Sequence, residues 1–324
     1  MNYSPATIII NKCISFSIRK LSKLLKYFIN IDDMLTRISQ AAPVSLVLQV
    51  TNICNANCIF CGYQYLKRPK TILPMDLFRK AIDEFTSLGG GDVVFNPPVG
   101  EPLIDPDFLE KIYYARSKPN IRVCGFYTNG ILINKVGARA IIRSGVGGIT
   151  ISIPGFDAQA YLRIFRTNQW DCVYSGIINL LRENALTGNK VNISLALRSD
   201  ISIRKLLKAP AYKELKKYKF FLEYNMFYDN WGGLIKQKDL IPRIRLRKIP
   251  KKTEPCFLLY GPPLILANGD MTLCGCRDLN GDTELVRGNI RNKSILELWQ
   301  DPGVDNIRKG FWLSRYPKIC LNCS

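Results

Sequence analysis

From residue 44 onward, short runs of apolar and β-branched residues alternate with longer amphipathic stretches. The short runs predict six strands, over residues 44–50, 92–96, 122–127, 148–153, 191–197 and 220–225. The amphipathic stretches predict helices over residues 75–88, 107–117, 135–144, 171–186 and 203–217. Repeated strand–helix units predict an α/β fold with a parallel sheet. The pattern leaves open a partial barrel or a doubly wound sheet, and in both the chemistry lies at the carboxyl ends of the strands.

The segments on either side differ from this pattern. Before it, Ile14, Ile18, Leu21, Leu25 and Phe28 recur at helical spacing among basic residues, which predicts an N-terminal helical extension over 1–43. Such a helix either packs against its own domain or makes peripheral contact with an anionic membrane surface.

The alternation ends after Trp231-Gly232-Gly233, which bounds a barrel or sheet domain at 44–240. Residues 243–252 hold six basic residues and predict a linker or edge segment. The remaining tail, 241–324, is rich in cysteine and loops, with helical sequence returning near residues 294–299. A small domain of this kind needs an internal cross-link or metal centre to be stable.

Composition narrows the chemistry. The 324 residues include 46 Lys and Arg against 26 Asp and Glu, a formal charge of +20, and no histidine. The missing histidine excludes Ser-His-Asp triads, Cys-His proteases and His-ligated zinc enzymes. The positive charge accompanies no nucleic-acid-binding module, so it predicts a basic surface or an anionic substrate rather than a nucleic-acid partner. Eleven cysteines without an export signal predict a reducing, cytoplasmic location.

Three cysteines follow directly after the first predicted strand. Cys54, Cys58 and Cys61 lie within eight residues, in the sequence CNANCIFC. Three thiolates can bind three irons of a four-iron cluster and leave the fourth iron open to another ligand. A zinc site needs a fourth ligand, and none is adjacent. We therefore predict an iron–sulfur cluster at the carboxyl end of this strand.

This CxxxCxxC loop, with Phe60 before its third cysteine, resembles the signature of radical S-adenosylmethionine (radical SAM) enzymes. The resemblance extends over about residues 44–230 and implies a partial (β/α)6 TIM-like barrel. It implies that the open iron of a [4Fe–4S] cluster binds S-adenosylmethionine. One electron, from a reductant such as flavodoxin or ferredoxin, then gives methionine and a 5′-deoxyadenosyl radical that abstracts hydrogen from a substrate.

Further positions match the family's cofactor-binding pattern. The stretch Val99-Gly100-Glu101-Pro102 stands where the family has a GGEP sequence, with valine replacing the first glycine. Without the resemblance these positions have ordinary explanations, such as turns, a strand residue and a surface arginine. The resemblance implies cofactor contacts from Phe60, Gly100, Glu101, Asn129, Ser152 and Arg166.

A second cysteine set lies in the tail. Cys256, Cys274, Cys320 and Cys323 come from two distant pieces and could close a zinc site or a second iron–sulfur cluster. The pattern, with the sequence of residues 288–299, resembles the SPASM or shorter twitch extension of the radical SAM family. That resemblance implies one auxiliary [4Fe–4S] cluster.

Cys276 is an additional thiol, two residues after Cys274. It is either a spare cysteine or a catalytic hydrogen-atom donor, which an epimerase would need. The remaining cysteines, Cys13, Cys124 and Cys172, are predicted to be packing residues.

The reaction follows less directly. The resemblance implies an enzyme that dehydrogenates or epimerises a substrate, for which we favour a small molecule, such as a sugar, aminoglycoside or glycan intermediate. The first alternative is a peptide-modifying epimerase or crosslinking enzyme. The second is a non-enzymatic iron–sulfur electron-transfer protein, which explains the cysteines but not the matches at Gly100, Ser152 and Arg166.

Overall fold

The computed structural model describes residues 33, 37, 41–95, 98–252, 256–274 and 277–324. The chain divides into two units, Met1–Ala41 and Ala42–Ser324. Most of the first unit, including the apolar positions of the predicted N-terminal helix, lies outside the described residues. The helical extension over 1–43 and its membrane contact therefore stay predictions.

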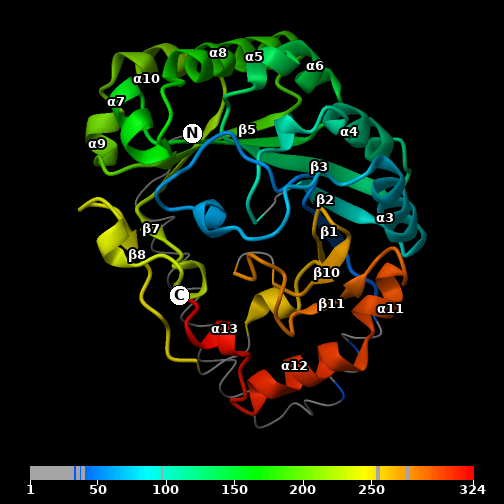
Figure 1. Cartoon of the computed structure of the whole chain (residues 1–324). Coiled ribbons are helices and arrows are strands. Elements are labelled where there is room, and N and C mark those ends of the chain that lie inside the picture. The colour runs from blue at the N-terminus through cyan, green and yellow to red at the C-terminus, as the bar shows by residue number, and fades with distance from the viewer. Residues whose placement is uncertain (1–32, 34–36, 38–40, 96–97, 253–255, 275–276) are drawn as a thin grey trace. The chain divides into compact units, whose positions relative to one another are not determined.

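The second unit is built on a parallel sheet whose strands follow chain order (Figure 1). Its six parallel strands are β1 (Ser45–Leu48), β2 (Gly91–Phe95), β3 (Ile121–Thr128), β4 (Gly148–Ile153), β5 (Asn192–Arg198) and β6 (Phe221–Asn225). Each pairs with the next, from β1 to β6, so the chain never reverses direction across the sheet as it does in a doubly wound fold. The first and sixth strands do not pair, so the predicted partial barrel is confirmed and it is open.

Helices cover one face of this sheet. They are α3 (Met75–Ser87), α4 (Phe108–Arg116), α5 (Ile133–Val136), α6 (Ala138–Arg143), α8 (Trp170–Leu186), α9 (Ile203–Leu206) and α10 (Pro210–Leu215). Two predicted helices, over 135–144 and 203–217, are each broken into two. Gly137 interrupts the first with φ 96°, and Pro210 begins a new helix in the second, where its ring cannot continue the preceding one.

The tail extends the same sheet. Strand β9 (Leu264–Ile265) pairs parallel to β1, followed by the antiparallel strands β10 (Asp270–Thr272) and β11 (Val286–Asn289). The helices α11 (Ile295–Trp299), α12 (Pro302–Trp312) and α13 (Lys318–Leu321) complete the tail. The domain boundary at residue 240 stays a prediction, because backbone pairing runs from β1 into the tail.

A separate ribbon forms inside the basic segment. Strand β8 (Arg245–Leu246) pairs parallel with β7 (Phe227–Tyr228), just after β6. The segment predicted as a linker or edge therefore contributes a strand.

A buried ion pair between Lys111 and Asp105 holds the loop after β2 in place. Lys111 of α4 donates to Asp105 and to the carbonyl of Leu73 (2.6 Å), and the Lys111 and Asp105 side chains are fully buried. We expect Lys111→Met to lower the free energy of unfolding by about 3–5 kcal/mol, because the buried Asp105 carboxylate loses its partner. Anaerobic urea titration followed by tryptophan fluorescence measures this free energy. The double variant with Asp105→Asn is the control and should regain most of the loss; a double variant as unstable as the single one would contradict the explanation.

Candidate active site

The three cysteines lie on a loop between β1 and a short 3-10 helix, η1 (Gly62–Tyr65). Neighbouring segments hold this loop through its backbone. The amides of Asn57 and Ile59 donate to the carbonyls of Phe165 and Ile164 (3.3 and 2.9 Å), in the π-helical turn η3 (Tyr161–Phe165). A third contact comes from far along the chain, where the Trp231 indole donates to the carbonyl of Phe60 (3.0 Å).

The three cysteines of this loop are partly buried, and their thiols lie close enough to influence one another. Burial raises the pKa of Cys54 to about 12 and of Cys61 to about 11, and it raises the pKa of Cys58 well above its usual value. Cys61 also raises the pKa of both other thiols by like-charge repulsion. Thiolates at this site therefore need a positive partner, which iron supplies.

Hydrogen-bond donors already point at two of the sulfurs. The Tyr63 amide donates to Cys61 Sγ (3.4 Å), and the Asn129 side-chain amide lies 3.8 Å from Cys54 Sγ. Such donors stabilise thiolates bound to a cluster and tune its potential. Among the described residues, no group of three Cys, Asp or Glu side chains is close enough to hold a single metal ion. A four-iron cluster does not need such a group, because each of its ligands binds a separate iron. The loop fits a cluster.

Asn129 is itself held by Glu101. One Glu101 oxygen accepts from Thr128 Oγ1 (2.7 Å) and the Leu103 amide (3.2 Å), and the other accepts from the Asn129 amide (2.7 Å). Burial raises the pKa of Glu101 to about 7, and these three hydrogen bonds oppose the rise. Both oxygens are thus engaged within the protein, which indicates that Glu101 positions Asn129. Its predicted direct contact with the cofactor stays a prediction.

Gly100 allows the strand after β2 to approach the cysteine loop. Its φ is 122°, and a Cβ there would lie 2.2 Å from the carbonyl oxygen of Thr51. The Glu101 amide then donates to the carbonyl of Ile53 (2.8 Å), directly before Cys54. A side chain at position 100 would push this loop away.

We expect Gly100→Ala to reduce S-adenosylmethionine cleavage at least tenfold and to lower the melting temperature, because it combines a strained φ with a backbone clash. Gly188→Ala is the matched control. Its φ is also positive (78°), but nothing lies within 4 Å of the added Cβ. The control should lose about 1 kcal/mol of stability and keep full cleavage. Equal behaviour of the two variants would show that the approach to Thr51 is unimportant.

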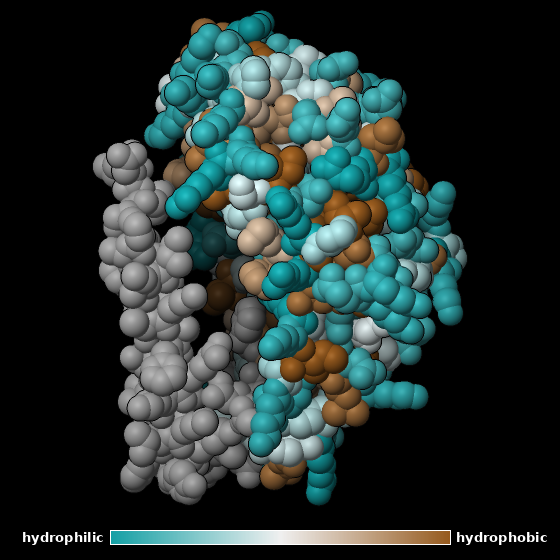
Figure 2. All heavy atoms as spheres, turned by 90° about the vertical axis from the view of Figure 1, so that its left-hand side faces the viewer, coloured by the Kyte–Doolittle hydropathy of each residue, from teal (hydrophilic) through white to brown (hydrophobic). Residues whose placement is uncertain are grey.

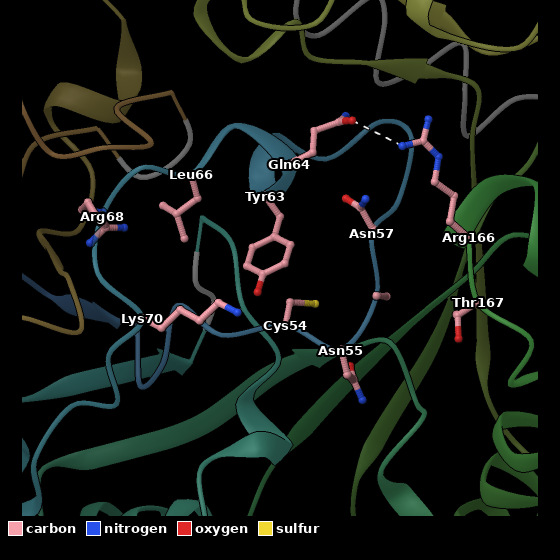
Figure 3. A pocket seen from close by; sticks show the side chains of 11 residues that line it. Cys54, Asn55, Asn57, Tyr63, Gln64, Leu66, Arg68, Lys70, Arg166 and Thr167 are labelled. Atoms are coloured by element: carbon pink, nitrogen blue, oxygen red, sulfur yellow. Dashed lines mark hydrogen bonds between the residues drawn. The ribbon is translucent and has the colours of Figure 1, made fainter.

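A pocket of about 570 Å³ opens beside Cys54 (Figure 3). The Tyr63 ring and the Lys70 amino group point into it, and Arg166 lies across it from Arg68. None of its described lining residues is acidic. These residues are Cys54, Asn55, Ala56, Asn57, Tyr63, Gln64, Leu66, Arg68, Lys70, Arg166 and Thr167.

Arg166 occupies this pocket in a strained conformation. It ends the π-helical turn with φ 56°, a left-handed conformation that costs an arginine roughly 1–2 kcal/mol. Its exposed guanidinium lies 3.5 Å from Gln64 Oε1. Strain of this kind is concentrated at ligand sites, where the surrounding structure holds it.

The other predicted residues are placed differently. Phe60 is covered by aromatic rings, stacking on Tyr228 with centroids 4.8 Å apart and meeting Phe165 edge-on at 5.8 Å. Ser152 lies on β4, on the half-buried face that alternates with buried Ile151 and Ile153, and it does not line the pocket. Cys276 lies outside the described residues, so both explanations for it remain open.

Several residues at the site were not predicted. They are Tyr63, Gln64, Arg68, Lys70, Thr128 and Trp231. The basic stretch after the third cysteine was a usable local signal for Arg68 and Lys70. No local signal identified Trp231, because its partner is 171 residues away in the sequence.

Three of the four tail cysteines belong to a second small core. Cys274 is buried there, and Cys256 and Cys320 pack against the same cluster of apolar residues. Burial raises the pKa of Cys320 to about 12, and repulsion from Cys274, Cys323 and Cys256 adds to it. The Lys252 amino group donates to the carbonyl of Cys323 (2.6 Å) and lowers the pKa of the Cys256 and Cys320 thiols. Cys256, Cys274 and Cys323 are therefore close enough to Cys320 to influence the pKa of its thiol.

Family models match both cysteine regions. Residues 48–208 match the radical SAM superfamily, and residues 256–324 match SPASM, an iron–sulfur cluster-binding domain. The two matches together cover more than two thirds of the chain. The chain belongs to the radical SAM superfamily. This radical SAM protein therefore has S-adenosylmethionine, a [4Fe–4S] cluster and an auxiliary cluster as its cofactors, and it is an enzyme.

Curated relatives of this radical SAM enzyme include GTP 3′,8-cyclases. That of Pasteurella multocida (strain Pm70) is 27% identical over 174 residues, which is 53% of this chain and 50% of the relative. That of Shewanella denitrificans is 29% identical over 153 residues, 46% of this chain and 44% of the relative. The chain spans about half the length of the curated relatives it matches.

Solved structures share the fold over most of the radical SAM chain. BtrN in complex with AdoMet and 2-DOIA has a TM-score of 0.58 at 17% identity, covering 87% of this chain and 93% of BtrN. The enzyme anSMEcpe with AdoMet and Cp18Cys peptide has a TM-score of 0.56 at 15% identity, covering 83% of each chain. SuiB of Streptococcus suis, bound to precursor peptide SuiA, has a TM-score of 0.51 at 17% identity, covering 85% of this chain and 69% of SuiB. At these identities the likeness shows the fold alone.

Proposed function

We propose that this protein is a radical SAM oxidoreductase that dehydrogenates a small, polar, anionic substrate, such as a sugar, aminoglycoside or glycan intermediate. The observation that carries the proposal is the pocket beside Cys54, with three cations and no acid among its described lining residues. Its volume of about 570 Å³ is typical of small-molecule sites.

The cofactors would be held by the residues predicted from the sequence. Cys54, Cys58 and Cys61 are the ligands we propose for the radical cluster, and Cys256, Cys274, Cys320 and Cys323 for the auxiliary cluster. When bound and reduced, the radical cluster and S-adenosylmethionine supply a 5′-deoxyadenosyl radical that abstracts a hydrogen atom from the substrate.

The protein's own residues position the reactants. Arg166 lines the pocket, and its planar guanidinium suits a carboxylate such as that of S-adenosylmethionine. Lys70 projects into the same pocket and has no ion pair among the described residues, so it suits an anionic group of the substrate. Phe60, partly buried and stacked on Tyr228, shields one side of the cysteine loop from water.

The tail supports oxidation over the alternatives. Dehydrogenation removes a hydrogen atom from the substrate and then a proton and one electron, and an auxiliary iron–sulfur cluster in the SPASM region suits the electron acceptor. Epimerisation needs a hydrogen donor instead. A cytoplasmic location is part of the proposal, since cysteine-ligated clusters need free thiols and a reducing compartment.

Anaerobic incubation with S-adenosylmethionine, dithionite and a panel of sugar and aminoglycoside phosphates and carboxylates tests the proposal. We expect one substrate to lose two mass units in step with 5′-deoxyadenosine formation. A product whose mass is unchanged in H2O and one unit higher in D2O would replace oxidation with epimerisation. If no member of this panel is consumed and a peptide added in a parallel reaction is, the proposed substrate class is wrong.

Lys70→Gln provides a residue-level prediction for this site. We expect KM for the substrate to rise at least tenfold, because a charge-assisted hydrogen bond contributes about 1.5–3 kcal/mol, while the Kd for S-adenosylmethionine stays within twofold. Lys67→Gln is the matched control, since Lys67 is exposed on the same loop and does not line the pocket. An unchanged KM in Lys70→Gln would remove the anion-binding role of Lys70.

A further inference from the structure

The ribbon β7–β8 has one face toward the cysteine loop and the other toward solvent. Tyr228 is paired with Leu246 and is only 6% exposed, with its ring stacked on Phe60. Phe227 is paired with Arg245 and is 49% exposed. Successive strand residues point to opposite faces. The neighbouring residues Phe227 and Tyr228 therefore place one aromatic ring in solvent and the other against the cysteine loop.

A second pocket, of about 540 Å³, lies on the outer face of this ribbon. Its apolar wall is Met226 and Phe227, which are 36% and 49% exposed. Three cations surround this wall, Lys205 from α9 and Arg243 and Arg245 from the β8 segment. Figure 2 shows the side on which β7 and β8 lie in Figure 1, where hydrophobic residues are set among hydrophilic ones.

The charge of this surface is not neutralised nearby. Asp200 is the single acid among the described lining residues, and it accepts two hydrogen bonds from Arg163 (3.1 and 2.9 Å). Within the described part of the chain, Lys205, Arg243 and Arg245 form no ion pair. An exposed apolar centre with a cationic rim is the composition of a protein-binding surface for an acidic partner.

We propose that this ribbon patch (Lys205, Met226, Phe227, Arg243 and Arg245) is the docking surface for an acidic one-electron carrier protein of the flavodoxin or ferredoxin kind. Radical SAM enzymes use a reductant, and the ribbon connects this surface to the cluster loop. From Phe227 the path continues to Tyr228, which stacks on Phe60, the residue before Cys61.

In this docking the carrier loses one electron and the radical cluster gains one. No atom is transferred between the two proteins. The inference rests on the radical SAM chemistry and not on the substrate proposed above. A small anion is the competing occupant of the pocket, and the test below separates the two.

A triple charge reversal, Lys205→Glu, Arg243→Glu and Arg245→Glu, tests the surface in the loaded enzyme. Its control is a second triple reversal, Lys135→Glu, Arg139→Glu and Arg182→Glu, at cations on the helices α5, α6 and α8. The first readout is the Kd for purified oxidised flavodoxin, measured by titration calorimetry at low and high KCl. We expect the wild-type Kd to rise at least tenfold with salt, the patch variant to bind at least thirtyfold more weakly at low salt, and the control to stay within twofold.

The second readout compares reductants. We expect the patch variant to cleave S-adenosylmethionine at the wild-type rate with dithionite, which needs no docking surface, and at least tenfold more slowly with flavodoxin and its NADPH-dependent reductase. The single variant Phe227→Ala, which changes no charge, should show the same selective loss, and it covers the case in which the triple variant fails to fold.

An unchanged flavodoxin Kd in both the patch variant and Phe227→Ala would overturn the proposal. So would inorganic phosphate binding that depends on the three cations while flavodoxin binding does not, since the pocket would then serve a small anion. Failure of these tests with intact dithionite-driven cleavage would leave the proposed enzymatic function standing.

Discussion

Replacing Cys58 with alanine is expected to abolish 5′-deoxyadenosine formation and to remove about four of about eight irons per chain, since two thiolates cannot hold a cluster with one open iron. Cys58 lies at the centre of the loop, and its backbone carbonyl accepts the Cys61 amide (3.0 Å). Iron and sulfide analysis after anaerobic reconstitution, with chromatographic assay of 5′-deoxyadenosine, measures both effects.

Cys172→Ala is the control for this experiment. Cys172 is a partly buried thiol on α8 that lies 3.4 Å from the carbonyl oxygen of Ile131 and is not one of the proposed cluster ligands. The control should keep all its iron and its cleavage rate. A Cys58→Ala enzyme with wild-type cleavage would show that the loop does not bind the radical cluster.

The Cys320→Ala variant is expected to keep cleavage of S-adenosylmethionine but to lose formation of oxidised product. The variant should lose the auxiliary cluster and about half of the iron but still form 5′-deoxyadenosine, because the barrel loop is intact. Oxidised product should fall at least a hundredfold, since the substrate radical then has no electron acceptor. Parallel assays of iron, 5′-deoxyadenosine and product measure the separation.

Metal analysis of the unmodified enzyme is the check on this result. If each chain holds two four-iron clusters, we expect about eight irons and no zinc per chain. About four irons with one zinc would make the tail a structural zinc site and would remove the oxidative mechanism.

The structure also shows how the two cysteine regions are connected. Trp231 donates to the carbonyl of Phe60, while its neighbour Asn230 donates to the carbonyl of Asn322 (2.7 Å), beside Cys323. The Trp231 ring lies so close to Gly62 that a Cβ there would be 2.7 Å from it. One short segment therefore contacts both cysteine regions, which fixes their separation.

The sequence by itself determined the strand–helix alternation, the open barrel's six strands and the cysteine loop after the first strand. These features depend on local periodicity and on spacing within a few residues, as with Cys54, Cys58 and Cys61, so no long-range contact is needed to recognise them. The family resemblance, which local motifs carry, also predicted Gly100 and Asn129; taken by themselves, these two positions have the ordinary explanation of a turn.

Only the tertiary structure decided which residues surround the cysteine loop. Pairing of β9 with β1, the indole of Trp231 on Phe60 and the engagement of Glu101 by Asn129 join segments that are distant in sequence. The structure also showed that two predicted helices are broken, at Gly137 and at Pro210, where the residue itself disfavours a continuous helix. Periodicity shows which face of an element is buried but not which distant segment covers it, because that choice depends on backbone hydrogen bonds and packing across the whole domain.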